Sequence, residues 1–164
     1  MHFEIRPARE QDCAVVSSLI HALADYEKLS QQCEATPEKI RKELFCDNPV
    51  AHCLLGWEVD DETQTQRPVA FALYFFNFST FLARKGLYLE DLFVEPQSRG
   101  KGLGSMMIRR LAQIATEQHC GRLEWVVLDW NTSAQAFYKK LGANILKEWF
   151  ICRVDGKRLE TLGQ

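Results

Sequence analysis

Residues 90–104 place two acidic side chains a few positions before a basic, glycine-rich turn. Glu90 and Asp91 are adjacent carboxylates, and the turn reads R-G-K-G-L-G over residues 99–104. Glycines let backbone N–H groups approach a phosphate closely, and an arginine can add a charge-assisted hydrogen bond. If a helix begins at this turn, its unpaired N–H groups and its dipole also favour an anion there. These residues therefore predict a phosphate site next to carboxylates that attract a cation.

The glycine-rich turn differs from two common phosphate-binding motifs. It lacks the third glycine of the dinucleotide pattern G-x-G-x-x-G and the G-K-[S/T] ending of a P-loop. A tight strand-to-helix turn without a ligand is the plainer interpretation. The apolar strand expected before the turn and the helix expected after it favour the phosphate site.

The two carboxylates lie in an otherwise apolar strand, between Leu89 and residues 92–94. Successive strand residues face opposite sides, so Glu90 and Asp91 can share one face only if a β-bulge redirects one of them. A solvent-exposed edge strand would explain them without a function. The apolar flanks instead indicate a buried strand, where a carboxylate needs a partner or a role.

A second group of polar residues follows the apolar run at residues 123–128. Asn131 is either a helix cap or a ligand contact, and Tyr138 is either a packing residue of an amphipathic helix or a chemical group. The sequence alone leaves both alternatives open. Cys120 has no activating neighbour that would make it a nucleophile. No catalytic Ser/His/Asp order and no metal-ligand spacing occurs, and we expect no metal.

Apolar periodicity, caps and turn residues predict the elements that position these groups. Strands are expected at residues 2–6, 52–59 and 69–78, from residue 88 to the turn at Pro96, at residues 123–128, and once or twice within residues 144–154. Helices are expected at residues 12–27, 36–48, 102–118 and 132–140, with Asp12 and Thr36 as caps and Asp155-Gly156 as a late turn. Two helices after the first strand, followed by an antiparallel meander, do not suit a doubly wound nucleotide-binding fold. We expect one mixed α/β domain over residues 1–164.

Composition limits the class of protein. The chain is 46% hydrophobic and 26% charged with a net charge of −2, so it has no basic excess for nucleic acid. Its apolar runs are shorter than the roughly 18 residues of a membrane span, and its first residues do not have the pattern of a secretory signal. The six cysteines form no C-x-x-C pair, which favours free thiols over disulfides and a cytoplasmic location.

The ordered motifs resemble those of the GNAT superfamily of acetyl-CoA-dependent N-acetyltransferases. The similarity consists of a strand, R-G-x-G-x-G at residues 99–104, a helix, a strand, Asn131, and F-Y-x-x-x-G-A at residues 137–143. Further segments are similar to the diamine acetyltransferase branch, which includes spermidine/spermine and thialysine acetyltransferases: residues 5–8, 26–29, 47–49, 52–54, 88–91 and 129–131. The resemblance spans essentially the whole chain. It implies a GNAT fold: a central, mostly antiparallel, splayed mixed sheet flanked by helices.

The resemblance also implies where acetyl-CoA would bind. The backbone of β-strand residues would pair with the pantetheine arm, namely Leu92, Phe93 and Val94. Amides of the turn would hold the pyrophosphate, namely Arg99, Gly100, Lys101, Gly102, Leu103, Gly104 and Ser105. A later helix would border the cofactor through Asn131, Thr132, Ser133, Ala134 and Tyr138.

The same resemblance implies an amine site centred on Glu90. The remaining substrate residues it implies are Tyr26, Glu27, Asp91, Glu124, Trp125, Val126 and Glu148. The family usually has an acid followed by Gly-Trp where this chain has Glu148-Trp149, so the assignment of Glu148 departs from the pattern. Glu90 would accept the amine proton through water, because an alkylammonium with a pKa of about 10.4 cannot attack a thioester. A backbone N–H near Leu92 would stabilise the oxyanion, and Tyr138 would protonate the leaving thiolate.

The expected reaction is acetyl transfer to a primary amine by direct attack in a ternary complex. Residues 129–131 and 26–29 are closer to the thialysine-type members, which favours lysine analogues slightly over di- or polyamines. The branch is typically homodimeric. Two other hypotheses stay open: a non-catalytic acyl-CoA-binding regulatory domain, and a protein N-acetyltransferase.

Overall fold

A computed structural model describes residues 1–164, which form two compact units, Met1–Val126 and Val127–Gln164. The first unit contains strands β1 (His2–Pro7), β2 (His52–Val59), β3 (Gln66–Ser79), β4 (Arg84–Val94) and β5 (Leu123–Trp125), and helices α1 (Cys13–Tyr26), α2 (Pro37–Leu44) and α3 (Leu103–Glu117). The second contains α4 (Thr132–Lys140) and α5 (Gly156–Leu162). The single domain expected over residues 1–164 stays a prediction. None of the helices combines the length and hydropathy that a membrane span requires.

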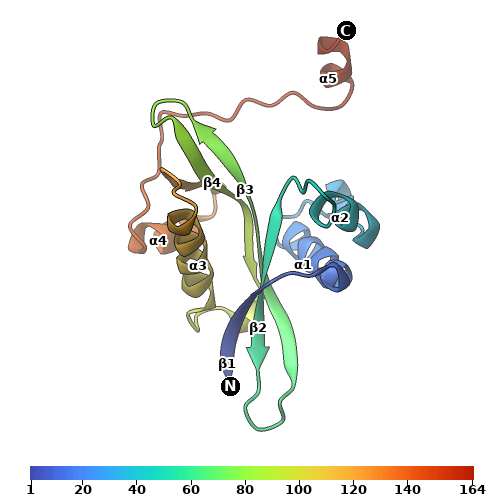
Figure 1. The fold of residues 1–164 in the computed structure, drawn as a ribbon, viewed down its shortest axis with the longest axis vertical. Helices are drawn as coiled ribbons and strands as arrows, with labels where there is room; N and C mark the ends of the chain where they lie inside the picture. The colour runs from blue at the N-terminus through green and yellow to red at the C-terminus, as the bar shows by residue number, and fades with distance from the viewer. The chain divides into compact units, whose positions relative to one another are not determined.

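The first unit is built on one mixed sheet with the strand order β1-β2-β3-β4-β5 (Figure 1). The first four strands are antiparallel to their neighbours, and β5 is parallel to β4. The β4–β5 pairing ends at Leu89 and Trp125, whereas β4 continues to Val94. The sheet is therefore mostly antiparallel and splayed at β5, and the predicted fold class is confirmed.

Helices cover both faces of this sheet. Figure 1 shows α1 and α2 on one side of the strands and α3 on the other. The buried core on the α1 side consists of Cys13, Val16, Leu19, Ile40, Cys53, Leu55, Phe71 and Phe93. On the α3 side, a Cβ added to Gly56 of β2 would lie 3.2 Å from Cδ1 of Leu103. The absence of a side chain at Gly56 therefore lets the first residue of α3 approach the sheet.

Most predicted elements form, and their local signals explain their starts. Thr36 caps α2 as expected, because its hydroxyl accepts a hydrogen bond from the Lys39 N–H at 3.2 Å. Asp12 precedes α1, but its carboxylate accepts from the Arg9 N–H at 2.8 Å and does not cap the helix. Strands β3 and β4 also begin earlier in the sequence than predicted, at Gln66 and Arg84, so each starts closer to the turn that precedes it.

The helix predicted at residues 132–140 forms as α4, but the strands and the turn predicted near the C-terminus were wrong. No strand forms within residues 144–154, and Gly156 begins α5 in place of a tight turn. The strand expected at residues 123–128 is limited to β5. Trp149 and Phe150, which made the final segment read as a strand, are 73% and 88% exposed. A strand needs a neighbouring strand to pair its backbone groups, and an apolar sequence alone does not provide one.

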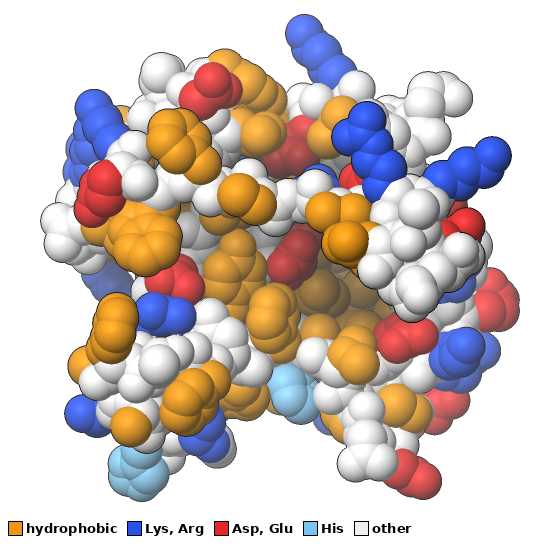
Figure 2. Space-filling view, turned by 90° about the horizontal axis from the view of Figure 1, so that it is seen from above, with side chains coloured by type: hydrophobic (Ala, Val, Ile, Leu, Met, Phe, Trp, Pro, Cys, Tyr) orange, Lys and Arg blue, Asp and Glu red, His pale blue; other side chains and the backbone are white.

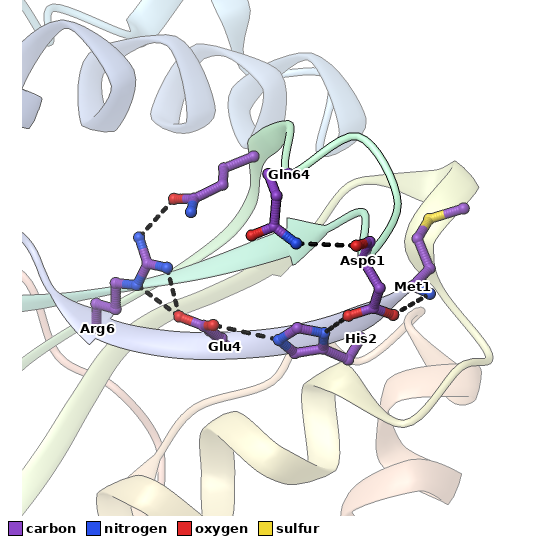
Figure 3. A network of polar contacts seen from close by, with 7 residues as sticks. Met1, His2, Glu4, Arg6, Asp61 and Gln64 are labelled. Atoms are coloured by element: carbon purple, nitrogen blue, oxygen red, sulfur yellow. Dashed lines mark hydrogen bonds and ion pairs between the residues drawn. The ribbon is translucent and has the colours of Figure 1, made fainter.

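A chain of polar contacts runs along β1 and connects it to the loop between β2 and β3 (Figure 3). The N-terminal ammonium and Nδ1 of His2 each lie 2.6 Å from the carboxylate of Asp61. Nε2 of His2 lies 3.2 Å from Glu4, which also accepts from the Nε of Arg6 at 2.8 Å. These side chains are substantially exposed, so each pair contributes little to stability.

Candidate active site

Glu90 is the extra residue of a β-bulge in β4. On β3, Leu73 pairs with Asp91 and the next residue, Tyr74, pairs with Leu89, which leaves Glu90 without a partner on β3. This is the irregularity that two neighbouring carboxylates needed in order to act on one site. The same shift places Tyr88 and Asp91 on one face of the sheet, since they pair with Phe75 and Leu73.

Asp91 lies in an acidic environment. Burial first, and then the negative charges of Glu90 and Glu27, raise the pKa of its carboxyl from 3.8 to about 6. Glu27 directly follows α1, and burial also raises the pKa of its carboxyl. The charges acting on Asp91 are thus both of its own sign. An ammonium group at this position would relieve the repulsion and favour the ionised carboxylate.

Tyr88 is a site residue that the sequence analysis missed. Burial, and then the charges of Glu90, Glu124 and Asp91, raise the pKa of its phenol. Its ring lies 5.1 Å from that of Phe75, and its backbone is in register with Glu124 of β5. The structure thus brings Glu90, Asp91 and Glu124 around one tyrosine. In the sequence, Tyr88 lies three residues before Asp91. This spacing puts the two side chains on one face only because of the bulge, and the bulge is known only from the register of β3 against β4.

Glu124 already has protein partners. Its Oε1 lies 3.3 Å from the guanidinium of Arg122 and accepts from Nδ2 of Asn77 at 3.4 Å. The next two residues were also predicted to contact the substrate. Trp125 is the last residue of β5 and pairs with Leu89, and the side chain of Val126 is half exposed. Glu124 therefore adds a partly neutralised charge to the acidic cluster.

The edge of β4 beyond Leu89 is not covered by β5. Leu92, Phe93 and Val94 pair with β3 on one side and have no strand partner on the other. The carbonyl of Val94 accepts a hydrogen bond from Nε of Arg99 at 2.8 Å. An uncovered strand edge presents N–H and C=O groups to which an extended ligand can add as a further strand.

The glycine-rich turn leads from β4 into α3 through two left-handed residues. Gly100 has φ 75° and Gly102, which precedes the first residue of α3, has φ 94°. A residue with a Cβ costs about 1–2 kcal/mol in this conformation, which explains both glycines. No side chain caps the start of α3. Its first N–H groups, from Leu103 to Ser105, are therefore available to an anion.

The basic side chains of the turn contact the protein. The guanidinium of Arg99 lies 4.4 Å from the ring centre of Tyr26 and 5.6 Å from that of Phe93. The ammonium of Lys101 lies 3.5 Å from Oε1 of Glu58. Figure 2 shows basic and acidic side chains interspersed over the face in view, in keeping with the net charge of −2. Both cations of the turn are thus engaged by protein groups.

In the second unit, Asn131 caps α4. Its Oδ1 accepts hydrogen bonds from the Ala134 N–H at 3.2 Å and from the Ser133 hydroxyl at 3.1 Å. Of the two alternatives for Asn131, the structure shows the helix cap. The ring of Tyr138 lies 5.1 Å from that of Phe137 on the same helix. Glu148 lies in the irregular segment between α4 and α5 and is exposed.

Comparison with known proteins decides the family. The model of the "Acetyltransferase (GNAT) family" matches residues 17–143. The chain belongs to this family. A thialysine N-epsilon-acetyltransferase from Bos taurus is 40% identical over 163 residues, which cover 96% of this chain and 95% of the relative. An L-ornithine N5-acetyltransferase from Arabidopsis thaliana is 28% identical, over 99% of this chain and 88% of the relative.

A solved structure shares the fold. An integron cassette protein from the mobile metagenome of V. cholerae superposes with a TM-score of 0.79 and 26% identity, covering 100% of this chain and 99% of that one. The predicted superfamily, and the branch with thialysine-type members, are thus confirmed. This GNAT protein is an enzyme that transfers an acetyl group to an amine.

The remaining side chains of chemical interest are possible metal ligands and the cysteines. No group of three or more His, Cys, Asp or Glu residues is arranged to hold a metal ion. All six cysteines are free thiols, as predicted. Burial raises the pKa of Cys53 to about 12, which makes it an unreactive core thiol.

Proposed function

We propose that this acetyltransferase moves the acetyl group of acetyl-CoA to a primary amine of a small cationic substrate, by direct attack in a ternary complex. The observation that carries the proposal is the acidic cluster of Glu27, Glu90 and Asp91 beside the uncovered edge of β4. Carboxylates that raise one another's pKa favour a cation, and the strand edge favours an extended acyl carrier.

The cofactor lies along β4 and the turn that follows it. Leu92, Phe93 and Val94 pair with the pantetheine arm as an added strand would. The amides of residues 99–105 hold the pyrophosphate at the start of α3. Residues of α4 border the cofactor, namely Asn131, Thr132, Ser133, Ala134 and Tyr138. The helix cap at Asn131 supports its part in this, since it fixes the first turn of α4.

The reaction requires deprotonation of the amine, stabilisation of the oxyanion and protonation of the leaving thiolate. Glu90, acting through water, takes a proton from the substrate ammonium, and the freed lone pair attacks the thioester carbonyl. The backbone N–H of Leu92 stabilises the oxyanion while the C–N bond forms. The C–S bond then breaks, Tyr138 gives its proton to the departing thiolate, and the nitrogen loses its second proton to water, which leaves the neutral amide. No covalent acyl-enzyme forms.

The remaining acidic and aromatic side chains select the substrate. Asp91 and Glu27 attract a second positive charge, and Tyr26, Glu124, Trp125 and Val126 border the amine, with Glu148 as a further acid. Lysine analogues such as thialysine fit this set, and di- or polyamines are the alternative substrate class. The names of the two relatives, with thialysine and ornithine, support amines carried on an amino acid.

Two wider properties belong to the same proposal. The enzyme acts in the cytoplasm, which the six free thiols support. It forms a homodimer, which the exposed aromatic side chains of Trp149 and Phe150 support, since apolar groups of this size favour association. Neither nucleic acid nor a membrane is a partner.

The test is release of free CoA thiol from acetyl-CoA with a panel of amines: thialysine, lysine, ornithine, putrescine, spermidine, spermine and a peptide. We expect turnover with small amines, a large loss for Glu90→Gln and Tyr138→Phe at pH 7, and none for the control Glu4→Gln on β1. CoA binding without turnover on any amine would instead identify a non-catalytic acyl-CoA-binding domain. Turnover confined to the peptide would identify a protein acetyltransferase.

A further inference from the structure

Four charged side chains form a cluster next to the phosphate turn, outside the acidic amine site. Glu58 of β2 stands opposite Arg67 of β3 in the sheet and accepts from its Nη2 at 2.9 Å. The other carboxylate oxygen of Glu58 lies 3.5 Å from Nζ of Lys101 in the turn. Arg67 also donates to Glu95, the residue between β4 and the turn. These four residues are called the turn cluster.

The turn cluster is more than an exposed ion pair. The Glu58 side chain is only 14% exposed, whereas that of Lys101 is 54% exposed. Hydrogen bonds from Arg67 first, together with the charge of Lys101, lower the pKa of the Glu58 carboxyl. Glu58 is therefore ionised at neutral pH. Arg67 also donates to the fully buried hydroxyl of Ser98 at 3.4 Å, which anchors the cluster to the turn.

Glu58 faces the side of the sheet on which α3 begins. Gly56, two residues earlier on β2, contacts Leu103, the first residue of α3. The ion pair of Glu58 with Lys101 links this carboxylate to the turn that precedes the first N–H groups of α3. The two acids and two bases of the turn cluster sum to zero charge, so Lys101 brings no net positive charge to the turn while Glu58 is ionised.

We propose that Glu58 determines how tightly the turn holds CoA: it competes with the CoA phosphates for Lys101 and so weakens binding. The proposal rests on the CoA site of the proposed function. Acetyl-CoA and the product CoA share the same phosphates, so an acid at this place weakens both. Weaker binding of CoA favours its departure, a step that limits turnover in many enzymes.

Titration calorimetry of CoA with the full chain tests the proposal. In Glu58→Gln, which keeps the size of the side chain and an acceptor for Arg67, we expect the Kd for CoA to fall about threefold to fivefold at low salt. The gain should shrink as salt rises, because ions screen exposed charges. The control Glu4→Gln removes a comparably paired carboxylate from β1 and should leave the Kd unchanged.

A second variant, Lys101→Gln, also tests the proposal in the native background, where the result does not depend on whether Glu58→Gln folds. Lys101→Gln should weaken CoA binding less in the native background than in the Glu58→Gln background. In the native protein alone, a loss greater than about tenfold in Lys101→Gln would show that Lys101 already serves CoA, and would overturn the proposal. Weaker or unchanged binding in folded Glu58→Gln would also overturn it. If the native protein bound no CoA, the proposed cofactor site would fail as well.

Discussion

Asp91 shows how a fold changes the chemistry of a single residue. The folded-state pKa of its carboxyl, about 6, lies above the value of 3.8 in an unfolded chain. The folded protein therefore holds the proton more tightly than the unfolded chain does. The stability linked to this proton is fully present below pH 3.8 and is lost as the pH rises through about 6.

The first prediction concerns this residue's effect on stability. Asp91→Asn removes the charge, and we expect the ligand-free protein to gain on the order of 1–3 kcal/mol in unfolding free energy at pH 8. The gain should disappear toward pH 4, where the native carboxyl is protonated. Urea unfolding across this pH range measures it. A variant that is destabilised at pH 8 would show that Asp91 is held by an unrecognised favourable contact.

The second prediction concerns the activity of the same variant. Protonation of Asp91 removes a charge that attracts the amine, so kcat/KM of the native enzyme should fall as the pH drops below about 6. In Asp91→Asn this acid limb of the pH profile should be lost. The KM for the amine should rise by roughly tenfold or more. The KM for acetyl-CoA serves as the internal control and should change little. An unaltered acid limb would assign it to another group.

Among the elements, the bulge in β4 is the feature on which the proposed amine site depends. Without Glu90 the ladder between β3 and β4 would be regular, since Leu89 and Asp91 pair with consecutive residues of β3. The bulge adds one carboxylate to the strand and leaves the inward and outward faces on both sides of it unchanged.

Deletion of Glu90 tests this view of the bulge. We expect the deletion variant to fold with a stability within about 1 kcal/mol of the native protein, because every remaining pair is kept. Acetyl transfer should be lost. Deletion of Leu92 is the matched control: it changes which face each following residue of β4 occupies, and it should be strongly destabilising. Thermal unfolding with thiol-release assays compares the two variants, and retained activity in the first would remove Glu90 and the bulge from the mechanism.

At the scale of the whole molecule, large apolar side chains remain exposed in the segment after α4. Phe150 is 88% exposed, although a strand was expected there. The association proposed above gives these side chains a place to be buried. Sedimentation velocity at micromolar concentration should show a dimer in the native protein and a monomer in Phe150→Asp.

A matched control exists in the first unit. Phe81, between β3 and β4, is 99% exposed, and Phe81→Asp makes the same change of an exposed phenylalanine to an acid in the first unit. It should leave the dimer intact. A native protein that sediments as a monomer, or a dimer that survives Phe150→Asp, would contradict this role for the C-terminal segment.

The amino-acid sequence alone predicted the family, the order of the elements in the first unit and the glycine-rich turn before α3. These features depend on local physics. Gly100 and Gly102 take positive φ because other residues resist it, and Thr36 caps α2 through a bond to a residue three positions away. Ordered motifs over nearly the whole chain then specified the family.

The groups of the proposed amine site are brought together by the tertiary structure. The register of β3 against β4 placed Glu90 in a bulge and brought Tyr88 to the carboxylates, and burial raised the pKa of Asp91. The same holds for Glu58, whose link to Lys101 joins residues far apart in the chain. The strands expected at residues 144–154 did not form. Each of these outcomes depends on a partner distant in sequence, and neither periodicity nor local propensity specifies such a partner.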